Sequence, residues 1–142
     1  MPQQVFINLP VRDLEKTKEF FTKLGFTFNP RFTDDTAACL IINEKAGFYA
    51  MLMTHESMRR FTTKAIADAH TTTETINAFS FESKEVVDAM FERAIAAGGK
   101  ETRPTEDYGW MYGRAFDDLD GHQWEFFYMD ISKMPANPAA AV

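Results

Sequence analysis

The sequence has little cysteine and no long apolar run, and each shortage excludes a class of protein. Its single cysteine, Cys39, rules out an internal disulfide framework and a cysteine-based zinc finger. No stretch of about 18 uncharged apolar residues occurs, so we expect no membrane-spanning helix. The first residues show no basic segment followed by an apolar one, which favours a cytoplasmic location.

Positive charge is also scarce. The chain carries 15 Lys and Arg against 21 Asp and Glu, a net charge of −6. Proteins that bind a phosphate backbone need a basic face, so we expect no nucleic-acid partner. The sequence also contains neither a glycine-rich phosphate loop nor the turn that carries a hydrolase nucleophile. The 142 residues fit one domain, or two small modules that share a core.

Aromatic residues are abundant, at 14% of the chain, and 14 of them are Phe. Eight Met accompany them. One interpretation is a core built from large, adaptable side chains. The other is that part of this apolar surface lines a ligand cavity. Composition alone leaves both open.

The first half of the chain predicts a strand, a helix and three more strands. Asp13 is a suitable N-cap, and the apolar spacing after it continues to a helix end at Gly25. The predicted strands span residues 5–9, 26–32, 37–42 and 47–54.

The second half predicts the same order. Ser83 is the N-cap candidate, and Gly98 and Gly99 end the helix. The predicted strands span residues 76–81, 100–105, 111–116 and 123–129. Residues 55–74 form a polar connector with a short helix near 57–61, and residues 131–142 form an Ala- and Pro-rich tail that we expect to be disordered.

Registers between the halves support a repeat. A shift of 70 residues and, for the last strands, one of 74 align equivalent positions, which are Phe6 with Ile76, Asp13 with Ser83, Phe21 with Phe91 and Met51 with Glu125. We therefore predict an α+β fold of two tandem βαβββ modules in one domain over residues 3–130. Module one spans about 4–54 and module two about 75–130.

Three segments of the chain resemble the sequence pattern of the vicinal-oxygen-chelate superfamily, which includes glyoxalase I, extradiol dioxygenases and the bleomycin- and fosfomycin-resistance proteins. They are Leu9-Pro10-Val11-Arg12-Asp13-Leu14-Glu15 with the helix after it, Ala96-Ala97-Gly98-Gly99, and Phe116-Asp117-Asp118-Leu119-Asp120-Gly121-His122-Gln123-Trp124-Glu125. Leu119 stands where the family's turn usually has proline. The pattern looks like that of members related to lactoylglutathione lyase, and it implies two sheets curled into one cleft.

The resemblance places a divalent metal on four side chains, one from the first and last strand of each module. The matching positions are Phe6, Met51, Ile76 and Glu125. Phe6 and Ile76 cannot ligate, and the Met51 thioether suits copper(I) rather than a harder ion. We therefore expect no metal or other cofactor.

Histidines are the other possible ligands. His122 lies three residues before Glu125, so strand alternation turns it to the opposite face or leaves it in the turn. His55 follows the strand of Met51, and His70 lies in the connector. A metal site would need His55 or His122 to fold inward.

Alternation also predicts which side chains share a pocket with Glu125. The strand residues are Phe6, Asn8, Tyr49, Met51, Ile76, Gln123 and Phe127. Residues 108–114 precede the last turn and would cover the pocket with Tyr108, Trp110 and Tyr112, unless they are an ordinary core strand. Such a pocket suits an aromatic or cationic small molecule.

Glu125 is the candidate catalytic residue. A carboxylate isolated among aromatic rings resists ionisation, so it could donate or accept a proton without a metal. The alternative is a structural role, with Glu125 hydrogen-bonded to Asn8 or Gln123.

Three functions follow. The first is a metal-independent small-molecule binder, like the resistance members that sequester a drug. The second is a metal-dependent enzyme of the lactoylglutathione-lyase or extradiol-dioxygenase type. The third is a structural or regulatory module that lacks the site. In each case we expect a homodimer, because open sheets leave edges for a two-fold partner.

Overall fold

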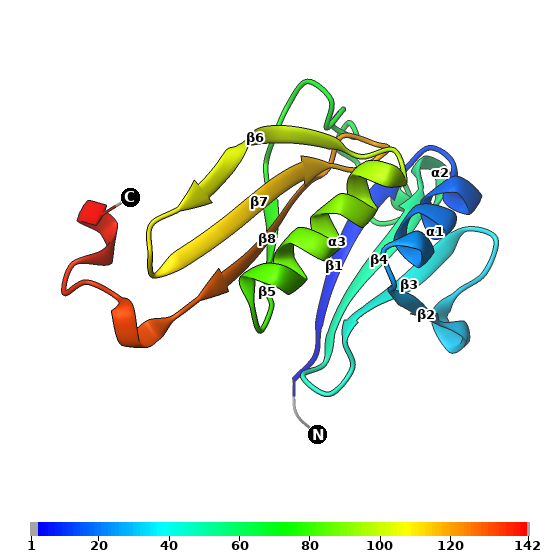
Figure 1. The fold of residues 1–142 in the computed structure, drawn as a ribbon. Helices are drawn as coiled ribbons and strands as arrows, with labels where there is room; N and C mark the ends of the chain where they lie inside the picture. Colours follow the sequence, from blue (N-terminus) through cyan, green and yellow to red (C-terminus); the bar gives the residue numbers. More distant parts are fainter. Residues whose placement is uncertain (1–2, 142) are drawn as a thin grey trace. The chain divides into compact units, whose positions relative to one another are not determined.

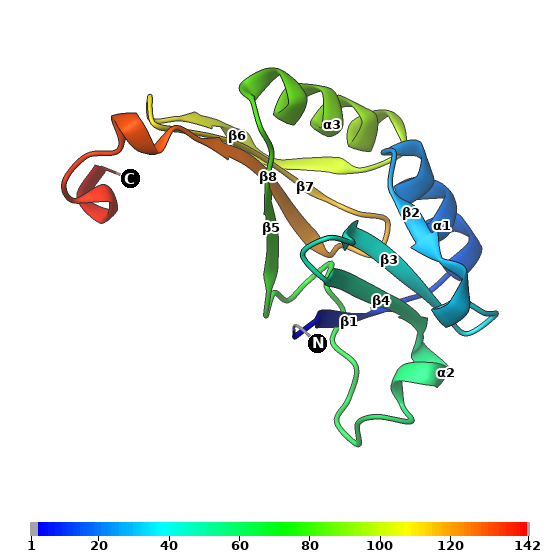
Figure 2. The same cartoon turned by 90° about the horizontal axis from the view of Figure 1, so that it is seen from below.

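The computed structural model describes residues 3–141, with side chains up to 139, and divides the chain into two units. Unit 1 ends at Asp68 and unit 2 begins at Ala69. Each unit holds one four-stranded sheet and a long helix, so the α+β fold of two βαβββ modules is confirmed (Figure 1). Unit 2 starts within the predicted connector, residues 55–74. This segment begins with a short helix and continues as a long loop to the next strand (Figure 2).

Unit 1 has the strand order β1-β4-β3-β2, with β1 parallel to β4. Its elements are β1 (Val5–Val11), α1 (Leu14–Lys23), β2 (Thr27–Asn29), η1 (Pro30–Phe32), β3 (Ala37–Asn43), β4 (Phe48–Thr54) and α2 (His55–Met58). The Asp13 side chain accepts the backbone N–H of Lys16, as its N-cap position predicts. Gly25, with a φ of 100°, allows the chain to leave the helix in a left-handed conformation.

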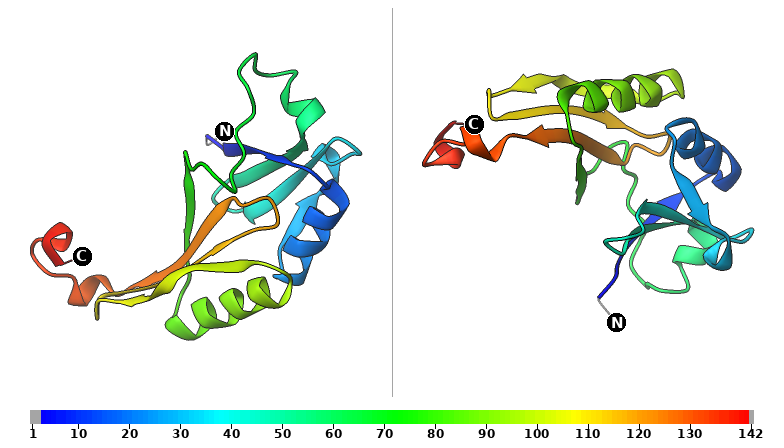
Figure 3. Two further views of the ribbon diagram at one scale, coloured as in Figure 1. Left: turned by 90° about the horizontal axis from the view of Figure 1, so that it is seen from above. Right: turned by 60° about the horizontal axis from the view of Figure 1, so that its bottom comes forward.

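Unit 2 has the matching order β5-β8-β7-β6, with β5 parallel to β8. Its elements are β5 (Ile76–Ser80), α3 (Lys84–Ala96), β6 (Lys100–Asp107), β7 (Met111–Asp117) and β8 (Gln123–Met129). Ser83 caps α3 by accepting the N–H of Val86. Helix α3 lies along one face of the sheet in both views of Figure 3.

Several predicted bounds differ from the observed ones, and β1 and β6 each run two residues longer than expected, to Val11 and Asp107. The strand expected over residues 26–32 stops at Asn29, whose side chain accepts the N–H of Arg31 and starts a 3₁₀ turn at Pro30. The short connector helix begins earlier than expected, because Thr54 caps it through the N–H of Ser57. The tail contains two 3₁₀ turns, η2 (Ile131–Lys133) and η3 (Pro138–Ala141), and its disorder stays a prediction.

Each core lies between the helix and one face of the sheet. In unit 1 the buried strand residues Leu9, Val11 and Leu52 accompany Phe20 and Phe21 of α1. In unit 2 the buried side chains are Val87 and Phe91 from α3 and Phe116, Trp124 and Phe126 from the sheet. The Phe91 and Phe116 rings meet edge to face at 6.4 Å. Much of the aromatic content therefore serves as core.

Within residues 3–141, no helix is long and apolar enough to cross a membrane. The cytoplasmic location stays a prediction.

Candidate functional site

Each sheet has an open face, which we define as the face turned away from its helix. In unit 1 the parallel register pairs Phe6 with Tyr49 and Asn8 with Met51 on this face. The Phe6 and Tyr49 rings stack at 5.0 Å. Alternation along β1 and β4 therefore groups these four predicted residues within unit 1.

In unit 2 the open face groups a second set. The register pairs Ile76 with Gln123, Ala78 with Glu125, and Ser80 with Phe127. Along β8 the side chains of Trp124 and Phe126 are buried against α3, whereas Gln123, Glu125 and Phe127 are partly exposed. Gln123, Glu125 and Phe127 occupy alternate positions of β8 and therefore share the open face of unit 2.

Glu125 is not isolated among aromatic rings, and its hydrogen bond comes from Arg103, a partner that neither alternative from the sequence named. Its Oε1 atom accepts a hydrogen bond from Nη2 of Arg103, and Nε of Arg103 donates to Oε1 of Glu106. The hydroxyl of Tyr108 donates to Oε2 of Glu106 at 2.7 Å. We call Arg103, Glu106, Tyr108 and Glu125 the open-face cluster.

Small residues of β7 make room for this cluster. Arg103 of β6 pairs with Ala115, which pairs in turn with Glu125 of β8. Glu106 likewise lies beside Gly113. Because the central strand presents only a methyl group and a hydrogen here, the Arg103 side chain can pass over it to Glu125.

The charges of the cluster reinforce one another. The Tyr108 hydroxyl and then the Arg103 guanidinium lower the pKa of Glu106 below its ordinary value. Donation to Glu106 raises the pKa of Tyr108. Burial opposes the charge on Arg103, but its bonds to Glu106 and Glu125 outweigh burial and raise its pKa. One guanidinium and two carboxylates leave the cluster with a formal charge of −1.

Arg103 and Glu106 are not among the site residues predicted from the sequence. Arg103 lies in the predicted strand 100–105, and its charge on a strand next to the 111–116 strand was the available signal. The register of β6 shifts between Arg103 and Glu106, so simple alternation along that strand does not predict that both reach the same face.

The four positions where the resemblance places metal ligands do not fit a divalent ion. Phe6 and Ile76 have no donor atoms, Met51 offers only a thioether, and Glu125 is bound to Arg103. In the part of the chain that the structure describes, no group of three or more His, Cys, Asp and Glu side chains is placed to hold a metal. The lack of a bound metal therefore stays our expectation, now based on the chemistry of the donors.

The histidines lie outside this cluster. His122 precedes β8 in the turn, where its backbone N–H donates to Oδ1 of the buried Asp118 at 3.0 Å. Asp118 also accepts the indole N–H of Trp124 at 2.9 Å, and burial raises its pKa. His55 begins α2, and His70 packs against Gly121, where an added Cβ would lie 2.7 Å from the His70 backbone nitrogen.

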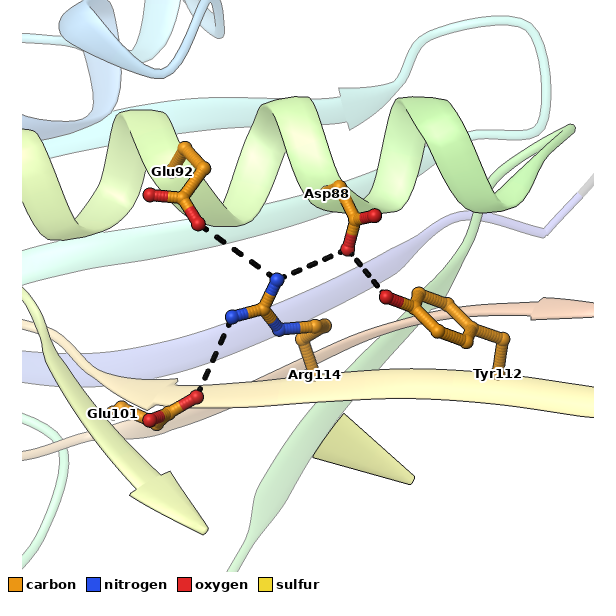
Figure 4. Close-up of polar contacts among 5 residues, drawn as sticks. All are labelled: Asp88, Glu92, Glu101, Tyr112 and Arg114. Atoms are coloured by element: carbon orange, nitrogen blue, oxygen red, sulfur yellow. Dashed lines mark hydrogen bonds and ion pairs between the residues drawn. The ribbon is translucent and has the colours of Figure 1, made fainter. Parts of the chain in front are cut away.

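Tyr112 lies on the helix side of its sheet, which corrects its expected place beside Glu125. Its hydroxyl donates to Asp88 of α3 at 2.7 Å, and Arg114 binds the same oxygen at 3.0 Å (Figure 4). Arg114 also pairs with Glu92 at 3.7 Å and with Glu101 at 3.5 Å. We call these five residues the helix-side cluster.

Trp110 and Cys39 are buried. Trp110, just before β7, is 8% exposed, and its indole Nε1 has no hydrogen-bond partner among the described residues. Cys39 pairs with Met51 across the strands, and burial raises the pKa of its thiol. Of the three aromatic residues expected to cover the pocket, Tyr108 alone joins the open-face cluster.

These features define a protein of two βαβββ modules, and comparison gives its family. The chain belongs to the Glyoxalase/Bleomycin resistance protein/Dioxygenase superfamily, which it matches over residues 3–126. A search of curated proteins yields no match.

Several solved structures share the fold. A hypothetical protein from S. aureus is 25% identical, with a TM-score of 0.75 over 90% of this chain and 94% of that one. A glyoxalase/bleomycin resistance protein/dioxygenase from Nocardioides is 25% identical, with a TM-score of 0.69 over 96% and 89%. A variant of the fosfomycin resistance protein FosX from Listeria monocytogenes, complexed with Mn(II) and 1S,2S-dihydroxypropylphosphonic acid, is 23% identical, with a TM-score of 0.66 over 93% and 94%.

Proposed function

We propose that this protein binds a small aromatic or cationic molecule without a metal at the superfamily position. The proposal rests on one observation, which is the hydrogen bond between Arg103 and Glu125. The other three positions where the superfamily has metal ligands hold Phe6, Met51 and Ile76. A lyase or dioxygenase of the superfamily type needs a metal to polarise oxygens or activate dioxygen. The side chains at the four positions in this chain do not provide the ligands that such a metal needs.

The chemistry of the open face of unit 2 supports a cation with aromatic character. The open-face cluster has a formal charge of −1, and the ring of Phe127 lies on the same face as Glu125. A cationic group gains from the carboxylates, and an aromatic body gains from the neighbouring rings. An anion such as a phosphonate would face two carboxylates and one guanidinium, so we expect it to bind weakly.

A thermal-shift screen tests this proposal. Matched aromatic amines and aromatic carboxylates are added to the protein, and a ligand at 100 times its Kd adds about 2.7 kcal/mol of stability. We expect amines to raise Tm, and Glu125→Gln and Phe127→Ala to reduce that rise. Phe32→Ala, in the exposed 3₁₀ turn of unit 1, serves as the control. Equal shifts for amines and carboxylates, or shifts unchanged in both variants, would reject the proposal.

We also propose that the protein forms a homodimer. Strands β1 and β5 are edges of their sheets, and Val5, Phe6 and Ile76 on them are 40–48% exposed. Exposed apolar edge strands favour pairing with a second copy. Light scattering that shows only the 16.2 kDa chain at micromolar concentration would contradict this.

A further inference from the structure

We propose that the Arg103 guanidinium is a built-in cation that takes the place of a divalent ion, and that its removal turns Glu106 and Glu125 into a divalent-cation site. The inference rests on the metal-free part of the proposed function and does not depend on the identity of any small molecule.

The Arg103 guanidinium lies at the one superfamily metal position that has a suitable ligand. Glu125 is the one residue at the four superfamily positions that suits a hard divalent ion, and its Oε1 atom is held by Arg103. A cation that is part of the chain cannot dissociate or be chelated. A metal that uses this oxygen must therefore displace a covalently tethered charge.

The second carboxylate is the next argument. Glu106 and Glu125 bind Nε and Nη2 of the same guanidinium, so their bound oxygens lie on one planar group. Without Arg103, two carboxylates would face each other with no positive charge between them, which is unfavourable unless a cation or a proton enters. Carboxylate oxygens are the ligands that Mg²⁺, Ca²⁺ and Mn²⁺ prefer.

Access is the third argument. The side chains of Arg103, Glu106 and Glu125 are 29%, 26% and 23% exposed, so water and ions reach the cluster. Gly113 and Ala115, which pair with Glu106 and Arg103, place no side chain larger than a methyl group beneath the cluster. Tyr108, bound to Glu106, adds a hydroxyl oxygen beside the carboxylates.

The experiment is a titration with Mn(II) alone, in which electron paramagnetic resonance measures the free ion. It compares the wild type with Arg103→Met, with Arg103→Lys, which keeps the charge, and with the double variant Arg103→Met/Glu125→Gln. We expect Arg103→Met to bind Mn(II) at least about tenfold more tightly than the wild type, at one ion per chain. Arg103→Lys and the double variant should bind as weakly as the wild type.

Arg114→Met is the matched control, because it removes a guanidinium from three carboxylates on the other side of the same sheet. An equal gain in this control would show nonspecific binding and overturn the inference. A folded Arg103→Met protein without the gain, or a wild type that binds Mn(II) tightly through Glu125, would also overturn it. If Arg103→Met does not fold, Arg103→Gln replaces it, and the wild type with Arg103→Lys still tests exclusion of the ion. Because the readout is the metal, failure of the small-molecule screen leaves this result unchanged.

Discussion

Helices α1 and α3 occupy the same place in their units, yet they are attached to their sheets differently. Helix α1 buries Leu14, Thr17, Phe20 and Phe21, and its ion pairs Lys18–Glu15 and Lys23–Glu19 join residues of the same helix. Helix α3 adds Asp88 and Glu92, which bind Arg114 of β7, and the Arg114 guanidinium lies 3.8 Å from the centroid of the Phe91 ring.

The open faces of the two sheets also differ, because the face in unit 2 carries more charged side chains than the face in unit 1. In unit 1 this face presents Phe6, Tyr49 and Met51, which are apolar or aromatic, together with the uncharged amide of Asn8. In unit 2 the equivalent of Met51 is Glu125, which lies in a cluster of charges. One repeated fold therefore carries an uncharged, mostly apolar group on the open face of one unit and a charged group on that of the other. The backbone pattern sets the fold, and a few side chains set the chemistry.

The largest expected effect tests whether the two cores are equivalent. Phe21→Ala and Phe91→Ala each remove a ring that is at most 3% exposed, so each should lower the free energy of unfolding by about 3–5 kcal/mol. Denaturant unfolding measures both. We expect losses of similar size, because Phe21 packs edge to face on Phe20 and Phe26, whereas Phe91 packs on Phe116 and the Arg114 guanidinium. Losses that differ by more than about 2 kcal/mol would contradict the equivalence of the two cores.

The second prediction concerns the polar anchor of the last turn. Trp124→Phe removes the indole N–H that Asp118 accepts, whereas Trp110→Phe removes an N–H without a partner among the described residues. Both lose the same ring atoms, so the difference isolates the bond. We expect Trp124→Phe to be more destabilising by about 1–3 kcal/mol, since it removes a hydrogen bond to a buried carboxylate. Equal losses in thermal and denaturant unfolding would contradict this.

The third prediction compares ion pairs of the two units. Arg114→Met should lower the free energy of unfolding by about 1–2 kcal/mol, because the Arg114 side chain is 16% exposed while its acidic partners remain open enough to be solvated. Lys23→Met in unit 1 breaks an exposed pair within α1 and should change stability by less than about 0.5 kcal/mol. Denaturant midpoints decide between this difference and equal effects.

The smallest effect is a pH dependence. The pKa of Glu106 is lowered in the fold, so its ionised form stabilises the protein above its ordinary pKa of 4.5. That contribution is lost as pH falls through the lower, folded value. The stability difference between the wild type and Glu106→Gln should therefore shrink below about pH 4.5.

Asp117 provides the opposite sign for comparison. Burial raises its pKa, so its ionisation costs stability as pH rises from its ordinary value of 3.8 through the folded value. Relative to Asp117→Asn, the wild type should therefore become less stable over that rise. Parallel trends for Glu106→Gln and Asp117→Asn in urea titrations would contradict the assignment of both directions.

Local signals predicted most of the fold. Asp13 and Ser83 mark the helix starts because a short polar side chain satisfies the free amides of the first turn, and Gly25 marks an end because it tolerates a positive φ. These interactions involve neighbours in the chain. Strand 26–32 was predicted too long because the Asn29 side chain competes with the sheet for the backbone of Arg31.

For the candidate site too, some features follow from the sequence and others only from the tertiary structure. Alternation along a strand determined that Gln123 and Phe127 share the face of Glu125, because successive side chains point to opposite sides. Sequence also determined that Phe6, Met51 and Ile76 cannot form an ordinary metal site, since ligation depends on donor atoms alone. Only the tertiary structure decided that Arg103 binds Glu125, because that contact depends on the irregular register of β6 and on small residues in the strand between them.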